Sequence, residues 1–425
     1  MATTGRWVGR PLKRVEDPRL LTGRGSFIDD HPPVANAHHA AIVRSPYAHA
    51  RIGGYDLSRA LGMPGVAGIV TGADVAQLTR PFSVGVTAPV HYYCAATDKA
   101  RFVGEPVAVV IARTRYLAED AADAVVVQYE PLPVVVDPER ALDPGAPVLH
   151  EAVGSNLAGQ RRLVYGDPDR AFKDADVVIS ERFRFPKYSS TPIETYGVIA
   201  RWDPLDGVLT IWSNFMGPFI MHPLVGRVLG LPENKLRFIV PPDIGGSFGI
   251  KTSIYPYLAL IGLAAMKTGV AVKWIEDRRE HLLASSSGTD RVAYRELAAK
   301  KDGTILGMRY RWLDNVGGYI RSPEPGCTFR PLGNWVGPYR FQNLEVDASV
   351  VMTNKSLTGP NRGYACGHLY FETERMIDLL AEKLGQDPAD VRRKNLISSD
   401  AFPYRTPTGG LYDSGDYGAA FQKAL

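Results

Sequence analysis

The stretch Pro241-Pro242-Asp243-Ile244-Gly245-Gly246-Ser247-Phe248-Gly249-Ile250-Lys251 places three glycines within five residues. An apolar, strand-like run at residues 236–240 precedes it, and an apolar, helix-like run follows from about residue 256. Glycine tolerates positive φ angles and leaves room for another group to approach the backbone. A strand, a glycine-rich turn and a helix start can together aim backbone N–H groups at an electron-rich ligand. The stretch lacks the G-x-G-x-x-G spacing of a dinucleotide loop, so glycine content alone favours a plain tight turn.

The composition is that of a folded globular protein with more than one domain. The 425 residues, 45% hydrophobic and 22% charged, exceed what one compact core holds. The net charge of +4 is small and its charges are interspersed, which excludes nucleic acid as an expected partner. The longest apolar run, residues 254–266, is too short for a membrane span. The N-terminus has no apolar signal core and no twin arginine, so we expect a cytoplasmic protein.

Three widely spaced cysteines, Cys94, Cys327 and Cys366, provide no metal framework. The sequence contains no C-x-x-C pair, so neither a zinc site nor an iron–sulfur site is expected in this chain. A sparse, odd count of cysteines is typical of a reducing compartment.

Pattern and punctuation predict an α+β chain in three parts. Residues 1–18 indicate an extended arm, residues 19–150 a mixed domain ending in a proline-rich linker, and residues 151–425 a second domain. Asp167 and Asp387 are predicted helix N-caps, the second with Asp390 as the acid of a capping box. The predicted strands are residues 39–44, 106–111, 125–129, 177–185, 207–213, 236–240, 270–275, 291–298 and 306–314. The predicted helices are residues 116–124, 168–175, 223–229, 256–266 and 368–384, with another from residue 388.

Eight stretches, in this order, resemble the large, molybdenum-binding subunits of xanthine dehydrogenase, aldehyde oxidase and aerobic carbon monoxide dehydrogenase. Any one of them is a weak signal, but their order and spacing together are specific. They are GRPLKRVED (residues 9–17), LTGRG (21–25), RSPYAHA (44–50), VGEPVA (103–108), YEPLP (129–133), GGSFG (245–249), VKWIEDRRE (272–280) and DPADVRRKNL (387–396).

The resemblance implies an α/β hammerhead domain at about residues 19–130 and the first part of a molybdenum-cofactor-binding domain from about residue 150. The implied cofactor is molybdenum on a molybdopterin, in bacteria the cytosine dinucleotide form, with no protein side chain on the metal. The backbone N–H groups of Phe248 and Gly249 would approach the metal's oxo group. The implied cofactor-binding residues are Gly245, Gly246, Ser247, Phe248, Gly249, Met216, Arg362 and Gly363, and the implied substrate-pocket residues are Phe248, Tyr364 and Cys366.

The second implied element is the turn at residues 359–366. Arg362 offers a fork of donors suited to anionic or carbonyl oxygens. The alternative is that Arg362 only caps carbonyl groups and that the glycines only turn the chain. The resemblance favours the binding role.

Four positions depart from the family pattern or have two interpretations. The carbon monoxide enzymes carry a copper-bridging cysteine directly after the loop arginine, and Gly363 stands there, so copper-dependent chemistry is not expected. Cys366 is then a small apolar residue. Met216 replaces a cofactor-binding glutamine, which removes a polar contact unless Asn214 substitutes. Glu194 matches a position near the pocket, where a structural role is equally expected.

Subunits of this family continue for several hundred residues more, and the glutamate that acts as base lies in that half, so no catalytic residue is assigned here. The leading hypothesis is the N-terminal part of a molybdenum hydroxylase active subunit, completed in trans by a second polypeptide. It would oxidise an aldehyde or a heteroaromatic C–H with water as oxygen source. Expected partners are an iron–sulfur small subunit and an FAD medium subunit. The alternatives are a non-catalytic scaffold subunit without cofactor, or a fragment of a longer chain.

Overall fold

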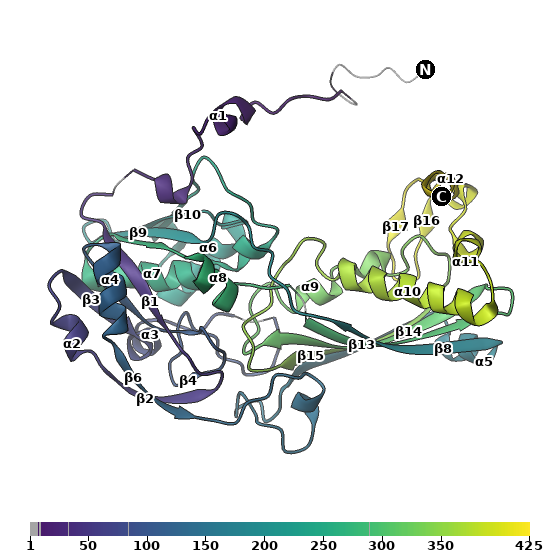
Figure 1. Cartoon of the computed structure of the whole chain (residues 1–425), viewed down its shortest axis with the longest axis horizontal. Coiled ribbons are helices and arrows are strands. Elements are labelled where there is room, and N and C mark those ends of the chain that lie inside the picture. The colour runs from purple at the N-terminus through teal and green to yellow at the C-terminus, as the bar shows by residue number, and fades with distance from the viewer. Residues whose placement is uncertain (1–6, 8–9, 33, 84, 289) are drawn as a thin grey trace.

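A seven-stranded sheet, in the order β11-β10-β9-β12-β1-β5-β3, organises the first of two lobes (Figure 1). Every residue of β5 is buried, which explains its continuous apolar run. β1 pairs with β5 on one side and with β12 on the other, where His38 lies opposite Val272, so the sheet crosses the predicted boundary near residue 150. The domain limits therefore stay a prediction. The strands are β1 (His38–Arg44), β3 (Val66–Thr71), β5 (Pro106–Ala112), β9 (Gly197–Asp203), β10 (Val208–Ser213), β11 (Leu236–Ile239) and β12 (Val272–Ile275).

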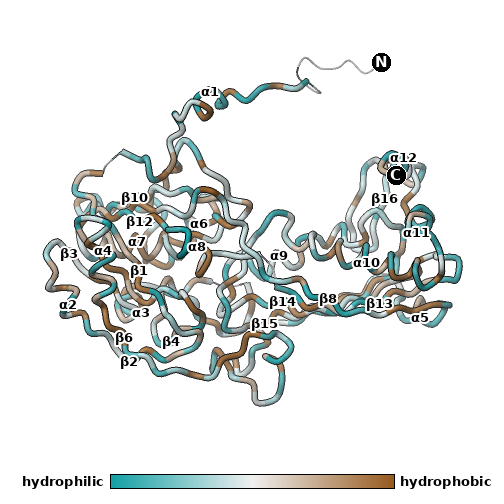
Figure 2. Tube along the Cα trace, in the orientation of Figure 1, coloured by the Kyte–Doolittle hydropathy of each residue, from teal (hydrophilic) through white to brown (hydrophobic). Residues whose placement is uncertain are grey.

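Helices cover both faces of this sheet in the computed structural model, which describes residues 7, 10–32, 34–83, 85–288 and 290–425. The predicted buried helix is confirmed as α7, whose residues 255–265 are all buried and which packs on β9, β12 and α6. Figure 2 shows hydrophobic residues gathered along α7 and β12. α4 covers the opposite face, against β1 and β5. The helices of this lobe are α2 (Ser58–Leu61), α3 (Gly72–Leu78), α4 (Arg115–Asp123), α6 (Pro218–Leu229), α7 (Tyr255–Thr268) and α8 (Arg278–Ala284).

The predicted start of α6 at Pro223 is wrong. The helix begins five residues earlier, where Gly217 has a φ of 78° and Pro218 takes the first helical position. Pro223 lies inside the helix and gives up one backbone hydrogen bond without ending it.

The arm and a small antiparallel sheet complete the first lobe. The sheet has the order β4-β2-β6. Residues 1–6 and 8–9 of the predicted arm lie outside the described residues, and a short helix begins at Asp17, inside the predicted arm. The elements are α1 (Asp17–Leu21), the 3₁₀ turn η1 (Ile28–Asp30), β2 (Ala50–Asp56), β4 (Lys99–Ala100) and β6 (Val126–Pro131).

A long five-stranded sheet, in the order β7-β15-β14-β13-β8, forms the second lobe with α10 on one face (Figure 1). Alternate residues such as Leu297, Trp312 and Val346 are buried in a core shared with Met376 and Leu380 of α10. The elements are β7 (Leu157–Tyr165), α5 (Pro168–Lys173), β8 (Val177–Phe185), β13 (Asp290–Ala299), β14 (Ile305–Gly317), α9 (Gly326–Phe329), β15 (Asn343–Met352), α10 (Cys366–Leu384), α11 (Pro388–Asn395), β16 (Tyr404–Arg405), β17 (Leu411–Tyr412) and α12 (Tyr417–Ala424).

The two predicted N-caps are confirmed, because Asp167 accepts a hydrogen bond from Arg170 N and Asp387 accepts one from Ala389 N. The capping-box role of Asp390 is wrong. Its carboxylate pairs with Arg393 one turn along the helix, so it does not reach back to the N-cap. No helix within the described ranges is long and apolar enough to cross a membrane.

Candidate functional site

The glycine stretch leaves β11 in a strained conformation and enters α7 through the 3₁₀ turn η4 (Ile250–Ser253). Gly246 and Gly249 have φ angles of 96° and 103°, which favour glycine, and Phe248 has a φ of 51° without being a glycine. Strain of this kind persists only where neighbouring contacts hold it, and it gathers at functional sites. The conformation of Phe248 makes the stretch a candidate functional site.

Glu194 holds the middle of the glycine stretch. Its carboxylate accepts hydrogen bonds from Gly245 N at 2.8 Å and from Lys251 Nζ at 2.5 Å. A Cβ at Gly245 would lie 2.5 Å from the Glu194 Cβ, so only glycine fits there. Burial lowers the pKa of Lys251, and Glu194 opposes that shift. These contacts give Glu194 the structural role considered for it.

Asp243 ties the front of the stretch to the N-terminal arm. Both guanidinium NH groups of Arg19 reach its carboxylate, one at 2.6 Å, and Ser26 N donates to it at 2.8 Å. The hydrogen bond from Arg19 lowers the pKa of Asp243. Two residues further, Ile28 N donates to Glu194 at 3.3 Å, so residues 19–28 form a strap over the stretch.

The two predicted binding elements meet in space. A Cβ at Gly249 would lie 2.7 Å from the Pro360 carbonyl oxygen, so the glycine stretch packs directly on the turn at residues 359–366. In that turn Tyr364 also has a positive φ, 53°, and its N–H donates to Asn361 O at 2.7 Å. The sequence resemblance did not predict this contact between the two loops.

A cavity of about 300 Å³ opens beside this junction. Met216 and Tyr364, both predicted, line it, whereas Phe248 and Cys366 do not. The lining also includes three residues that the sequence did not single out, Thr252, Tyr255 and Arg330. The guanidinium of Arg330 lies 4.8 Å from the Tyr364 ring centroid, so the cavity has one cationic wall among mainly apolar ones.

The other predicted residues have the following positions. Arg362 and Gly363 are exposed, and the Arg362 side chain has no hydrogen bond or ion pair to any described residue. Cys366 is partly exposed at the start of α10, and burial raises the pKa of its thiol. Ser247 Oγ accepts hydrogen bonds from Gly249 N and Lys251 N, each at 3.2 Å, and lies 3.7 Å from Met216 Sδ.

Two expectations on polar contacts are corrected by these bonds. Gly249 N–H is engaged by Ser247 Oγ and is not free for a ligand, whereas Phe248 N–H has no acceptor in the described part of the chain. Asn214 does not replace the missing glutamine. Asn214 is fully buried. Its side-chain oxygen accepts a hydrogen bond from Gly197 N at 3.1 Å, and its side-chain nitrogen donates one to Thr195 O at 2.7 Å.

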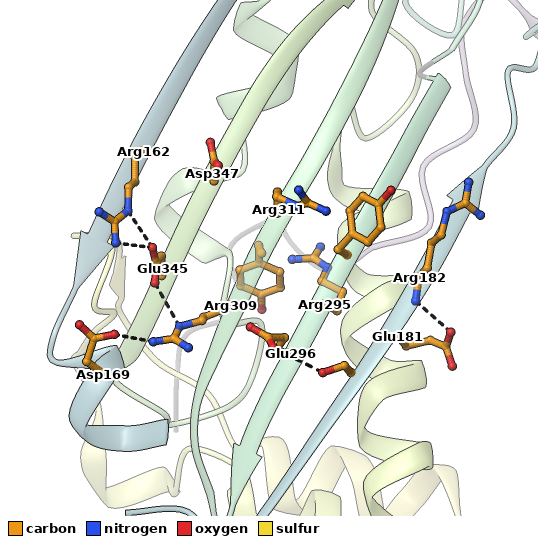
Figure 3. A pocket seen from close by; sticks show the side chains of 13 residues that line it. Arg162, Asp169, Glu181, Arg182, Arg295, Glu296, Arg309, Arg311, Glu345 and Asp347 are labelled. Atoms are coloured by element: carbon orange, nitrogen blue, oxygen red, sulfur yellow. Dashed lines mark hydrogen bonds and ion pairs between the residues drawn. The ribbon is translucent and has the colours of Figure 1, made fainter. Parts of the chain in front are cut away.

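A second hollow, about 770 Å³, lies on the open face of the five-stranded sheet (Figure 3). Arg309 pairs with Glu345 and Asp169, and Arg162 also pairs with Glu345, at 2.6 Å. Opposite charges thus satisfy one another along the strands, which indicates a solvated face. Within residues 10–32, 34–83, 85–288 and 290–425, no cluster of three His, Cys, Asp or Glu side chains could hold a metal ion.

Two family profiles match the chain over most of its length. The profile of the molybdopterin cofactor-binding domain matches residues 149–396. The profile of the aldehyde oxidase and xanthine dehydrogenase a/b hammerhead domain matches residues 22–133. The chain belongs to this family of molybdenum-dependent oxidoreductase large subunits.

Relatives within the family differ in length. The carbon monoxide dehydrogenase large chain of Afipia carboxidovorans is 36% identical over 98% of this chain, which covers 53% of that relative. The nicotinate dehydrogenase large molybdopterin subunit of Eubacterium barkeri is 30% identical over 91% of this chain, which covers 89% of it. The structure of quinoline 2-oxidoreductase from Pseudomonas putida 86 superposes with a TM-score of 0.90 at 32% identity, with 97% of this chain and 53% of that one covered. The chain thus spans about half the length of several curated relatives.

The residues at the junction fit a molybdopterin cofactor. The fit rests on the Phe248 N–H, which has no acceptor among the described residues, and on Gly249, whose Cβ would fill the space between the two loops. A preorganised backbone donor of this kind suits an anionic or oxo group. The cytosine dinucleotide form and the individual roles of the predicted residues stay predictions.

Proposed function

We propose that this chain is the N-terminal part of the active subunit of a molybdenum hydroxylase that oxidises an aldehyde or a heteroaromatic C–H with water as oxygen source. A second polypeptide with the C-terminal half of the large subunit would complete it in trans. An iron–sulfur subunit and an FAD subunit would carry the electrons away. We place the complex in the cytoplasm.

The observation that carries this proposal is the match in length to one relative. This chain covers 89% of the nicotinate dehydrogenase large molybdopterin subunit, against 53% of the carbon monoxide dehydrogenase large chain. A family member with nearly the same extent therefore exists as a subunit in its own right. A large subunit of this extent is compatible with the proposed completion by a second polypeptide.

An exposed apolar rim beside the site also supports a completing partner. Ile193 and Phe219 are 96% and 91% exposed, and Ile220 is 60% exposed. The rim is continuous with the site, because Glu194 N donates to Gly245 O next to Ile193, and Ile220 lies against Gly217 beside Met216. Large apolar groups gathered at one edge mark a surface that another polypeptide covers.

The chain's own residues would bind and orient, and would not act as base. When bound, the molybdenum cofactor supplies the two-electron oxidation of the substrate carbon. Phe248 N–H would donate to the cofactor, and Met216, Tyr255 and Tyr364 would shape the adjoining cavity. Glu194 is held by Lys251 and Gly245, so the base would come from the partner half. With Gly363 after Arg362, copper-dependent oxidation of carbon monoxide is not proposed.

A non-catalytic scaffold subunit is the second candidate. Met216 in place of a cofactor-binding glutamine favours it, because Asn214 does not restore the lost contact. A scaffold subunit would still need the exposed apolar rim to bind its partner, but it would not need the strained glycine stretch.

The two candidates are separated by co-expressing the tagged chain with the genes that flank it. Co-purification of a polypeptide matching the C-terminal half, together with water-dependent oxidation of an aldehyde or a heteroaromatic ring, supports the enzyme. A stable, monodisperse monomer that recruits no such polypeptide contradicts completion in trans. Co-purification without any oxidation by the full complex favours the scaffold.

A further inference from the structure

Arg321 differs from the other deeply buried arginines of the described chain. Arg101, Arg291 and Arg295 each have a carboxylate within ion-pair distance, at 3.3 Å to Asp98 for Arg101 and 2.6 Å to Asp314 for Arg291. Arg321 is 2% exposed and has no carboxylate at that distance among the described residues. Its charge is therefore buried without a protein counter-charge.

Its hydrogen bonds are also incomplete. A guanidinium carries five N–H donors. For Arg321 one protein acceptor is found in the described ranges, the Leu357 carbonyl, at the long distance of 3.5 Å, and Nε is buried without a partner. An unpaired buried charge of this kind is too costly to leave uncompensated in a stable fold.

The surrounding groups do not neutralise the charge. Tyr92, Tyr196, Tyr255 and Tyr257 face Arg321, and burial raises the pKa of each, so their phenols are neutral at physiological pH.

The carboxyl groups around the same tyrosines are bonded by other residues. Glu276 accepts a hydrogen bond from Tyr196 N at 3.1 Å and lies 2.8 Å from His281 Nδ1, and Glu105 accepts one from Arg101 N at 2.6 Å.

Asp290 is bonded by Lys355 at 2.6 Å and by Asn315 at 2.9 Å. Burial lowers the pKa of Lys187, which donates to Ser356, to about 7, and an amine in either protonation state supplies no negative charge to Arg321.

A second unsatisfied donor lies beside Arg321. The buried Tyr255 hydroxyl oxygen faces the backbone N–H of Ser322, the residue that follows Arg321, and its own O–H has no acceptor among the described residues. We propose that Arg321 and the Tyr255 hydroxyl bind a small monovalent anion of chloride size. Arg321 is 2% exposed and faces four tyrosines, so a small ion is proposed over a carboxylate-bearing organic ligand.

The anion would have a structural consequence for the candidate site. Tyr255 and Ser322 both line the 300 Å³ cavity, so an anion behind them would fix that wall. This inference does not depend on the proposed reaction.

Bromide offers a direct test, because it replaces chloride and scatters anomalously. The full chain, purified with its co-expressed partner subunits, would be crystallised in sodium bromide. We expect an anomalous peak within hydrogen-bond distance of the Arg321 guanidinium and the Tyr255 hydroxyl. Peaks at exposed lysines only, or water density at Arg321, would overturn the proposal.

A solution test uses matched variants. Replacing gluconate by chloride at constant ionic strength should raise the melting temperature of the wild type by about 2–4 °C, because the anion binds the folded state alone. Arg321→Met should lose this rise, and Arg311→Met, which removes an exposed arginine stacked on Tyr294, should keep it. An equal rise in R321M contradicts the proposal. If R321M does not fold, the bromide map of the wild type decides.

Discussion

Lys251 Nζ lies 2.5 Å from a carboxylate oxygen of Glu194, and the lysine side chain is fully buried. This ion pair sits under the glycine stretch, and the same carboxylate also bonds Gly245 N. A carboxylate that could be taken for a catalytic base thereby anchors the glycine stretch. The pair determines how the glycine stretch can be altered experimentally.

Glu194→Gln should destabilise the fold by about 3 kcal/mol, because it leaves the buried Lys251 ammonium without its counter-charge. The loss should shrink as pH rises toward the ordinary lysine pKa of about 10.4, since a neutral amine needs no partner. Urea unfolding at several pH values measures it. Glu119→Gln, which breaks the exposed pair with Arg115, is the control and should cost about 0.3–0.5 kcal/mol.

Gly249→Ala should cost about 3 kcal/mol and loosen the cavity. An alanine would be strained at a φ of 103°, and its Cβ would meet Pro360 O at 2.7 Å. Gly230→Ala is matched to it, because Gly230 has a positive φ of 66° with nothing within 4 Å of its Cβ. It should cost only the backbone strain, about 1 kcal/mol. Equal melting temperatures for the two variants would show that the loops do not pack together.

Asp243→Asn should release the strap at residues 19–28 while leaving the rest of the fold intact. The variant loses the ionic contact with Arg19, and the hydrogen bond from Ser26 N weakens. Hydrogen exchange should speed up within the strap and stay unchanged in β5. Asp17→Asn, which breaks an exposed pair with Arg14, should leave the strap protected.

The wild type should show the same release of the strap at low pH. Since the pKa of Asp243 is lowered in the fold, its contribution is present above the ordinary carboxyl pKa and is lost as pH falls through the lowered value. Strap protection that persists in strong acid would contradict this assignment.

Two buried carboxyl groups should make the fold less stable as pH rises. Burial raises the pKa of both Glu105 and Glu324 to about 7. Each folded pKa lies above the unfolded one, so its contribution is complete below about pH 4.3 and is lost as pH rises toward 7. Melting temperatures from pH 5 to 8, about the span of the two transitions, should fall in the wild type and fall less in Glu105→Gln or Glu324→Gln. A melting temperature of the wild type that does not change with pH would contradict the raised pKa values of the two buried carboxyl groups.

The sequence predicted the local elements well, because their signals are local. The apolar run of α7, the N-cap at Asp387 and the alternation in β13 each lie within one segment. Strands β2, β3, β7, β9 and β15 were missed. The crossing of the predicted boundary by β1 and β12 depends on pairing between residues more than two hundred apart. Such pairing has no local signal.

The site was predicted in part for the same reason. The motif resemblance singled out the glycine stretch and residues 359–366 as binding elements, and the two segments do pack together in the structure. The sequence did not identify Thr252, Tyr255 and Arg330 as cavity residues. Thr252 and Tyr255 lie where the chain enters the apolar run of α7, and Arg330 lies in a loop without a motif. The use of Gly249 N–H by Ser247 Oγ depends on one side-chain rotamer, which sequence patterns do not specify.

Elemental analysis of the purified complex tests the central claim most directly. The chain, co-expressed with its neighbouring subunits in cells supplied with molybdate, should carry close to one molybdenum per chain, and Gly249→Ala should lower that content while Gly230→Ala keeps it. An active complex without molybdenum would contradict the account.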